Sequence, residues 1–447
     1  MLTPTMAAGE PSRFEVERAL EIGLALSEFP VGFCLLTHHD QQYVAYYDQD
    51  RRMKIAARRL DSDQWQYQFL PTQVGWDSHN GIVMAVDSDG QLHISGNMHC
   101  AELIYFRTET PGDIGTLKAA PMTGERESSV TYPMFFKDHL GRLVFNYRDG
   151  RSGEGVRIYN KYDTRTRTWS RLLNEPILDG EGERNAYPVG PVLGPDNRFH
   201  LLWVWRDTPD CATNHHLSYA RSNDLLNWES VGGEEVELPM KLGDQSLWVD
   251  PIPSGGGIIN GGARLNFDSQ NRPVVAYHKS DSDGNMQVYV ARFEDDRWLR
   301  RQLTDWSKPV HFSGGGSMGF IGIRIGGLEI AQPGVFVLGY RHRDYGSGRL
   351  VIDEETLQLS QKTISRPRAY PDELSRVQST FPDMQIRRSH DVGEQTDSAV
   401  HCFLQWESLP ANQDGPRDPP LPAPSKLMLY ELRATPHSAA SSTGDLP

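Results

Sequence analysis

Residues 87–99 read DSDGQLHISGNMH, in which a polar turn is followed by a run of alternating, strand-like residues. The Gly of this turn tolerates a positive φ, and the β-rich run after it favours a hairpin. The pattern returns as DHLGRLVFNYRD at 138–149, PDNRFHLLWVWRD at 195–207 and DSQNRPVVAYHKSD at 268–281. The chain therefore contains a repeated hairpin, with weaker copies at 38–47 and 332–344.

A second element recurs after each of these hairpins. Segments such as ARSNDLLNW and ARFEDDRW end on tryptophan, and the four tryptophans are Trp65, Trp169, Trp228 and Trp298. Units of about 50 to 60 residues, each with room for four strands, are typical of β-propeller blades. We predict an all-β fold, a seven-bladed β-propeller of four-stranded antiparallel blades, with six or eight blades as alternatives. A pair of β-sandwiches or a β-helix is the competing architecture.

The chain divides into three parts on this interpretation. Residues 1–29 are an N-terminal extension with a short amphipathic helix over 14–27, residues 30–433 are the propeller, and residues 434–447 are a disordered tail. The Pro-rich stretch 409–424 reads as a loop. We expect the strand near 33–36 to close the ring with the C-terminal strand.

Composition excludes several classes of function. The 447 residues carry 45 Lys and Arg against 59 Asp and Glu, a formal charge of −14, so no basic surface favours nucleic acid. No apolar run approaches the roughly 20 residues that span a bilayer. Four scattered cysteines require no disulfide. We expect a monomer without membrane or nucleic-acid partners. As written the chain is cytoplasmic, or periplasmic or secreted if a signal peptide was removed.

The repeat places unusual side chains in equivalent positions. His79, Tyr132 and Tyr187 lie 9 to 11 residues before the turn Gly or Asn of three consecutive units. His99, Arg148 and Arg206 lie on one face of the strands that follow those turns. Equivalent positions on consecutive inner strands of a propeller converge near its axis. We therefore expect His79, His99, Tyr132, Arg148 and Tyr187 to line one pocket.

These residue types fit β-elimination from a uronic acid better than hydrolysis. Glycosidases need two suitably spaced carboxylates, which these segments do not offer. A serine hydrolase needs a GxSxG elbow, which the sequence lacks. Elimination needs a cation on the substrate carboxylate and groups that take up and donate a proton, which Arg, His and Tyr supply.

Several segments resemble the BNR-repeat family, which includes propeller polysaccharide lyases acting on ulvan and on rhamnose–glucuronate linkages. They are WDSHNG (76–81), SGNMHC (95–100), TYPMFF (131–136), FNYRDG (145–150), LLWVWRDTPDCATNHH (201–216) and VVAYHKSD (274–281). The resemblance implies that His79, His99, Tyr132 and Arg148 are catalytic, with Arg148 neutralising the carboxylate. It further implies that Tyr187 binds substrate, and we expect Arg206 and Asn80 to assist.

A second constellation has the composition of a metal site. Cys211, His215 and His216 follow one repeat strand, and His278 lies in the equivalent strand of the next unit. Cys and His are good tetrahedral zinc ligands, and lyases of the family often carry a structural zinc. We expect no cofactor for catalysis and a structural zinc here, with calcium as the alternative and a polar loop as the competing interpretation.

The sequence therefore predicts a polysaccharide lyase that cleaves an anionic, uronate-containing glycan by β-elimination. The expected product is a 4,5-unsaturated uronate, formed at a rhamnose–glucuronate type of linkage in an ulvan-like or rhamnosyl-glucuronan polymer. A non-catalytic carbohydrate-binding propeller and a sialidase-like hydrolase are the alternatives. The choice among His79, His99 and Tyr132 for base and acid stays open at this point.

Overall fold

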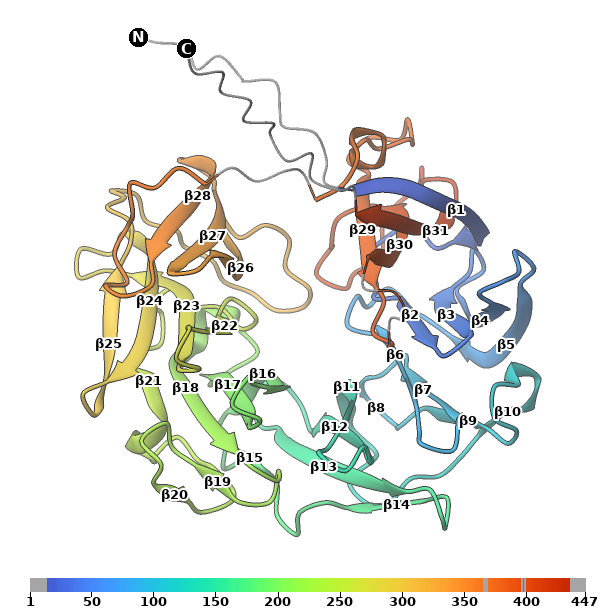
Figure 1. Ribbon diagram of the computed structural model, residues 1–447, viewed down its shortest axis with the longest axis horizontal. Helices are drawn as coiled ribbons and strands as arrows, with labels where there is room; N and C mark the ends of the chain where they lie inside the picture. Colours follow the sequence, from blue (N-terminus) through green and yellow to red (C-terminus); the bar gives the residue numbers. More distant parts are fainter. Residues whose placement is uncertain (1–13, 365–368, 395–396, 398, 435–447) are drawn as a thin grey trace, which may run out of the picture.

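A computed structural model describes residues 14–364, 369–394, 397 and 399–434. In these ranges the chain forms seven antiparallel sheets that stand around a central axis (Figure 1). The prediction of an all-β chain of repeated antiparallel sheets is confirmed. No helix in the described ranges is long and apolar enough to cross a membrane. The predicted tail falls almost entirely on residues outside these ranges.

The first three sheets follow the N-terminal strand and are built from consecutive hairpins. The first contains β2 (Cys34–His38), β3 (Gln41–Tyr47), β4 (Arg52–Arg59) and β5 (Gln66–Gln73). The second contains β6 (Ile82–Val86), β7 (Leu92–Gly96), β9 (Tyr105–Thr108) and β10 (Leu117–Ala119). The third contains β8 (His99–Ala101), β11 (Val130–Lys137), β12 (Leu143–Asp149), β13 (Val156–Asp163), β14 (Thr168–Arg171) and β15 (Leu178–Asp179).

The next three sheets continue around the ring. The fourth contains β16 (Asn185–Leu193), β17 (Phe199–Arg206), β18 (Asn214–Ser222), β19 (Trp228–Glu229), β20 (Glu235–Val236) and β21 (Trp248–Asp250). The fifth contains β22 (Arg264–Phe267), β23 (Pro273–Ser280), β24 (Met286–Glu294) and β25 (Arg297–Gln302). The sixth contains β26 (Ile323–Gln332), β27 (Val335–His342) and β28 (Gly346–Asp353).

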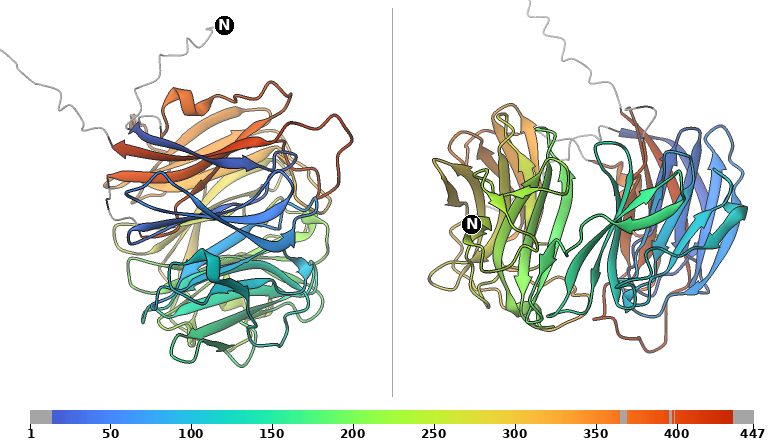
Figure 2. Two further views of the ribbon diagram at one scale, coloured as in Figure 1. Left: turned by 90° about the vertical axis from the view of Figure 1, so that its right-hand side faces the viewer. Right: turned by 90° about the horizontal axis from the view of Figure 1, so that it is seen from below.

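The seventh sheet joins the two ends of the chain and corrects two predictions. It contains β29 (Gln385–His390), β30 (Val400–Ser408), β31 (Ser425–Ala434) and, at its outer edge, β1 (Phe14–Ala25). The helix predicted over 14–27 is wrong, because this segment is β1, which lies antiparallel beside β31 (Figure 2). The strand β2 near 33–36 does not close the ring with β31, and the boundary at residue 30 is wrong because β1 belongs to the sheets.

The repeated turn has the chemistry that the sequence indicates. Gly90 and Asn197 have φ of 81° and 62°, in the left-handed region. In the turn between β6 and β7, Asp87 Oδ1 accepts hydrogen bonds of 2.9 Å from the backbone N–H groups of Asp89 and Gln91. An Asp carboxylate that satisfies its own turn in this way stabilises the hairpin through local contacts.

The four repeat tryptophans take equivalent places, as predicted. Trp169, Trp228 and Trp298 lie on β14, β19 and β25, each following the third strand of its sheet, and Trp65 immediately precedes β5. Trp203 and Trp205 on β17 are also buried within the sheets. The indole rings fill the space between neighbouring sheets, which fixes the inner strands that carry the candidate site.

Candidate active site

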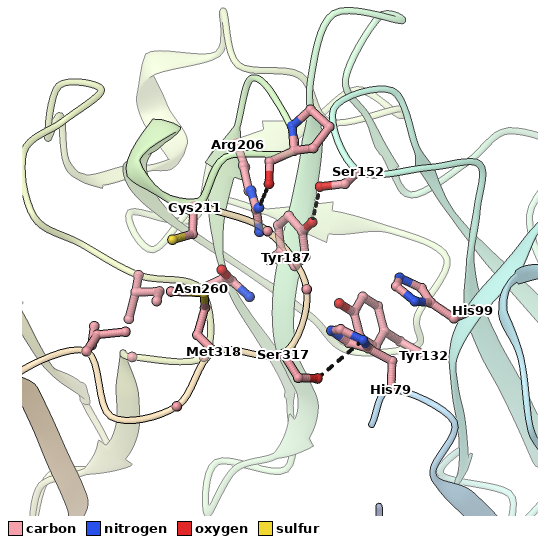
Figure 3. A pocket seen from close by; sticks show the side chains of 18 of the residues that line it. His79, His99, Tyr132, Ser152, Tyr187, Arg206, Cys211, Asn260, Ser317 and Met318 are labelled. Atoms are coloured by element: carbon pink, nitrogen blue, oxygen red, sulfur yellow. Dashed lines mark hydrogen bonds between the residues drawn. The ribbon is translucent and has the colours of Figure 1, made fainter. Parts of the chain in front are cut away.

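A cavity of about 740 Å³ opens where the inner strands and their connecting loops meet. The predicted residues His79, His99, Tyr132, Tyr187 and Arg206 all line it (Figure 3). They come from the loop before β6, from β8, and from β11, β16 and β17. The structure thus brings together four of the five positions expected to line one pocket, and Arg148 is the one that it leaves out.

One carboxylate holds both histidines. Asp77 Oδ1 lies 2.8 Å from Nδ1 of His79, and its Oδ2 contacts Nδ1 of His99. Asp77 Oδ1 also accepts a 2.8 Å hydrogen bond from the backbone N–H of His79, which fixes the local turn. The two imidazole rings consequently lie 4.2 Å apart at their centroids. Asp77 therefore orients the pair, as a carboxylate orients a catalytic histidine.

A second carboxylate reaches His79 from the other end of the chain. Asp414 lies in the Pro-rich loop 409–424, and its Oδ2 is 3.1 Å from His79 Nδ1. The same carboxylate accepts hydrogen bonds from the backbone N–H groups of Ser78 at 3.1 Å and Ser317 at 2.8 Å. Asp414 thus ties together three loops that come from different sheets.

These contacts decide the charge of both histidines. Burial lowers the pKa of His99, but the hydrogen bonds and charges of Asp77 and Cys100 outweigh it and raise that pKa to about 9. Burial also lowers the pKa of His79, and Asp414 and Asp77 raise it by more. His99 is therefore an imidazolium at neutral pH. Burial tends to raise the pKa values of Asp77 and Asp414, yet their histidine partners hold both below the usual range, so both are ionised.

Tyr132 sits at a strained point of β11. Pairing between β11 and β12 is interrupted between Thr131 and Met134, and Tyr132 has a φ of 55° there. A non-glycine residue in this region costs about 1–3 kcal/mol, a strain that is found mostly at functional sites. The Tyr132 ring lies 5.8 Å from that of His79 and 6.5 Å from that of His99. Burial, followed by the nearby Tyr187, raises the Tyr132 pKa well above its usual range.

Tyr187 and Arg206 form the opposite side of the cavity. The hydroxyl groups of Tyr187 and Ser152 are 2.7 Å apart, and the two tyrosine rings lie 6.1 Å apart. The Arg206 guanidinium carbon is 5.4 Å from the centre of the Tyr187 ring, and Nε donates to the Thr208 carbonyl at 3.0 Å. Arg206 is thus the predicted arginine that the fold brings into the cavity.

Arg148 and Asn80 lie behind the cavity rather than in its lining. Arg148 is 2% exposed and donates through Nη2 to Thr131 Oγ1 at 3.0 Å and to Cys100 Sγ at 3.2 Å. Its guanidinium carbon is 5.1 Å from the Tyr132 ring centre. The interruption at 131–134 places Tyr132 in the cavity and Arg148 beneath it. The expectation that Arg148 itself contacts the substrate carboxylate does not agree with this placement.

The four predicted zinc ligands are not gathered at one point. Cys211 and His278 line the cavity, but His215 and His216 do not. His215 Nε2 is 2.8 Å from Asp207, its Nδ1 is 2.7 Å from Nδ1 of His216, and His278 Nδ1 is 2.9 Å from the Gly257 carbonyl. These side chains do not fit a tetrahedral site as they stand, and zinc here stays a prediction that elemental analysis of chelator-washed protein can test.

Three residues at the site, Asp77, Asp414 and Ser317, were not predicted from the sequence. Among the described residues, Asp77, His79, His99 and Asp414 form the one group of His, Cys, Asp or Glu whose potential ligand atoms all lie within 4.8 Å of one another. The spacing of Asp77 and His79 in the turn DSHN is a signal that could have revealed Asp77. Asp414 has no such signal, because its approach depends on a contact across 335 residues of chain.

Comparison with known proteins agrees with this architecture. Ulvan lyase, short isoform, of Alteromonas sp. (strain LOR) is 24% identical over 257 residues, which are 52% of this chain and 42% of that relative. The chain thus matches less than half the length of its curated relative. The crystal structure of polysaccharide lyase Uly1 and the solved structure of a PL25 ulvan lyase superpose with TM-scores of 0.61 and 0.59 at 13% identity. The two superpositions cover 94% and 92% of this chain and 100% and 95% of the lyase chains. The two lyases therefore have the same fold as this chain. Residues 41–306 match the family described as BNR repeat-containing family member, and because this is more than half of the chain, the chain belongs to that family.

Proposed function

We propose that the chain is a polysaccharide lyase that cleaves a uronate-containing glycan by β-elimination. The observation that carries the proposal is the pair of histidines held by Asp77, which lie beside Tyr132 in the lining of the cavity. Solved relatives of the same fold support it, and one of them is bound to -[GlcA(1-4)Rha3S]-. A rhamnose–glucuronate linkage in an ulvan-like polymer is the proposed substrate, and the seven sheets are the proposed seven blades.

The reaction moves one proton off the sugar and one onto the leaving oxygen. A base takes the proton from C5 of the uronate, the C–H electrons form the C4=C5 bond, and the C4–O bond breaks. His99, protonated at neutral pH, supplies positive charge and a proton on one side of the cavity. Tyr132 takes up the C5 proton as the phenolate, after its own phenol proton has passed to the neighbouring His79 in its neutral form. Arg148 acts from beneath as a fixed positive charge that favours a transient Tyr132 phenolate.

The two carboxylates that hold the histidines do not favour a hydrolase. Glycoside hydrolysis needs a carboxylic acid with a raised pKa that can protonate the leaving oxygen. Asp77 and Asp414 both have lowered pKa values and hydrogen-bond to imidazoles, so neither carries a proton to give. A non-catalytic binding propeller is the remaining alternative, and it would leave its ligand intact.

The products of a substrate screen separate these functions. We expect ultraviolet absorbance from the conjugated C4=C5 bond to appear with ulvan or a gum-arabic-type rhamnosyl glucuronan, and not with pectins or glycosaminoglycans. Prior chelation should leave the rate unchanged, because Nδ1 of each histidine is committed to a carboxylate. New reducing ends without absorbance would indicate a hydrolase, and retardation of an unaltered glycan would indicate a binding protein. Either result would contradict the proposal.

A further inference from the structure

A second hollow, of about 480 Å³, adjoins the candidate active site. It lies between the sheet of β26–β28 and the sheet that contains β29 and β30, and its lining includes Arg324, Arg341, Arg387, Arg388 and Trp406. Arg324 and the loop residues 317–319 line both cavities. A chain molecule bound at His79 and His99 could therefore continue into this hollow without leaving the surface.

The hollow is strongly basic in an acidic protein. Four arginines line it and no Asp or Glu does, although the whole chain has 59 acidic against 45 basic residues. Arg324 and Arg341 are direct partners in the pairing of β26 with β27, an arrangement of like charges that destabilises a sheet. None of the four arginines lies within 4.0 Å of a carboxylate oxygen of any described residue. No carboxylate of the described residues thus pairs with these positive charges.

Neutral groups hold two of these arginines in place. Arg387, the strand partner of Trp406, donates to Ser408 Oγ at 2.8 Å and to the Leu409 carbonyl at 2.9 Å. Arg388 comes next in β29 and turns its guanidinium to the other face of the sheet, where its Nε donates to Gln405 Oε1 at 2.8 Å and its guanidinium carbon lies 3.9 Å from the Tyr370 ring centre. Burial, followed by the charge of Arg324, lowers the pKa of Arg387 to about 10. Trp406 is 4% exposed, and its indole N–H has no partner among the described residues. The hollow therefore holds fixed cations beside a largely buried indole ring.

We propose that this arginine hollow is a second anion-binding subsite for the same glycan, which takes a carboxylate or sulfate oxyanion on a sugar away from the bond that is broken. The proposal rests on the proposed function and adds a substrate requirement, namely a polyanion long enough to reach both cavities. Guanidinium groups bind either oxyanion with paired hydrogen bonds. Phe320, whose ring lies 4.4 Å from the Arg341 guanidinium carbon, and Trp406 add apolar surface for a sugar ring.

Binding at a distance from the reacting bond predicts an effect on KM rather than on kcat. Arg341→Gln and Arg387→Gln should each raise the KM for polymeric ulvan roughly tenfold with kcat nearly unchanged. Both variants should also weaken the dependence of KM on salt, because fewer charges remain to be screened. Arg301→Gln on the outer strand β25 removes an exposed arginine elsewhere and should change neither constant.

A comparison of ulvan with desulfated ulvan identifies the anion that the hollow binds. If the hollow takes sulfate, the effect of Arg341→Gln should disappear on desulfated ulvan, and if it takes a carboxylate, the effect should persist there. Oligosaccharides too short to span both cavities should show the same KM with wild type and variant. An unchanged KM for polymeric ulvan in both Arg341→Gln and Arg387→Gln would overturn the subsite while leaving the lyase intact.

Direct binding separates this proposal from the proposed function. Affinity electrophoresis in gels that contain ulvan needs no turnover, and Arg341→Gln should migrate with less retardation than wild type and Arg301→Gln. If wild type makes no unsaturated product but the variant still loses retardation, the lyase proposal fails and the subsite stands. If wild type and both hollow variants are retarded equally, the subsite is wrong whatever the activity.

Discussion

Tyr132→Phe is expected to lower kcat for elimination at least about 10²–10³-fold, the loss seen when one group that acts on developing charge is removed. The ring and its contacts with His79 and Tyr187 are kept, while the hydroxyl that exchanges a proton with the substrate is lost. KM should change little, because the ring still fills the cavity. The measurement is the initial rate of ultraviolet absorbance with ulvan, together with the melting temperature of both proteins.

Tyr159→Phe is the matched control for this variant. Tyr159 is a buried phenol on β13 of the same sheet, and it is not part of the cavity lining. Its substitution should leave kcat unchanged. If Tyr132→Phe folds normally and retains near wild-type elimination, the site is placed wrongly.

Asp77→Asn is expected to have an effect of similar or larger size. The Asn side chain is nearly isosteric with Asp, but its one oxygen cannot accept hydrogen bonds from both imidazoles as the two carboxylate oxygens do. His79 and His99 therefore lose their common orientation. By analogy with the carboxylate that orients a catalytic histidine, kcat should fall by about 10²–10⁴. The fold should survive, because Asp77 and the two histidines are partly exposed.

The pH profile distinguishes the loss of histidine orientation in Asp77→Asn from a general loss of folded enzyme. His99 has a pKa raised from 6.5 to about 9, so its charge and the stability that this charge provides are complete below pH 6.5 and are lost as the pH rises through about 9. Activity that needs the imidazolium should fall over the same range. In Asp77→Asn the alkaline limb of kcat should move to lower pH, since burial then dominates.

Asp196→Asn is the control variant for the expected shift in the pH profile. Asp196 contacts Nε2 of His200 at 2.9 Å in the turn between β16 and β17, outside the cavity. Its substitution should cost some stability and leave the pH profile in place. An Asp77→Asn enzyme with the wild-type profile would mean that His99 does not act as a charged group in the reaction.

Local chemistry explains which parts of the fold were predictable. The turns at Gly90 and Gly141 satisfy their own backbone groups, so their signal is contained in a few residues. The prediction of a helix over 14–27 is wrong because the pairing of β1 with β31 is interrupted at 16–18 and 21–23. Such interruptions break the alternation of a strand and leave a pattern that resembles a helix.

The same reasoning separates the predicted from the unpredicted site residues. His79, His99, Tyr132 and Tyr187 hold equivalent positions in a repeat, and a repeat converts sequence spacing into spatial position. The placement of Arg148 depends on the interruption after Thr131, which no spacing reveals. The position of Asp414 beside His79 depends on how the loop 409–424 packs against other loops, which is a tertiary property.

The pairing of β1 with β31 also governs how the chain can assemble. Phe14 pairs with Ala434, so the two partners are separated by nearly the whole sequence and meet only late in synthesis. Until then β1 has no partner strand and presents unpaired N–H and C=O groups to other chains. Glu15, Glu17 and Glu21 project from it as exposed negative charges, which repel a second copy of the same strand. The sequence of β1 thus protects the nascent protein from aggregation during the interval before the ring is complete.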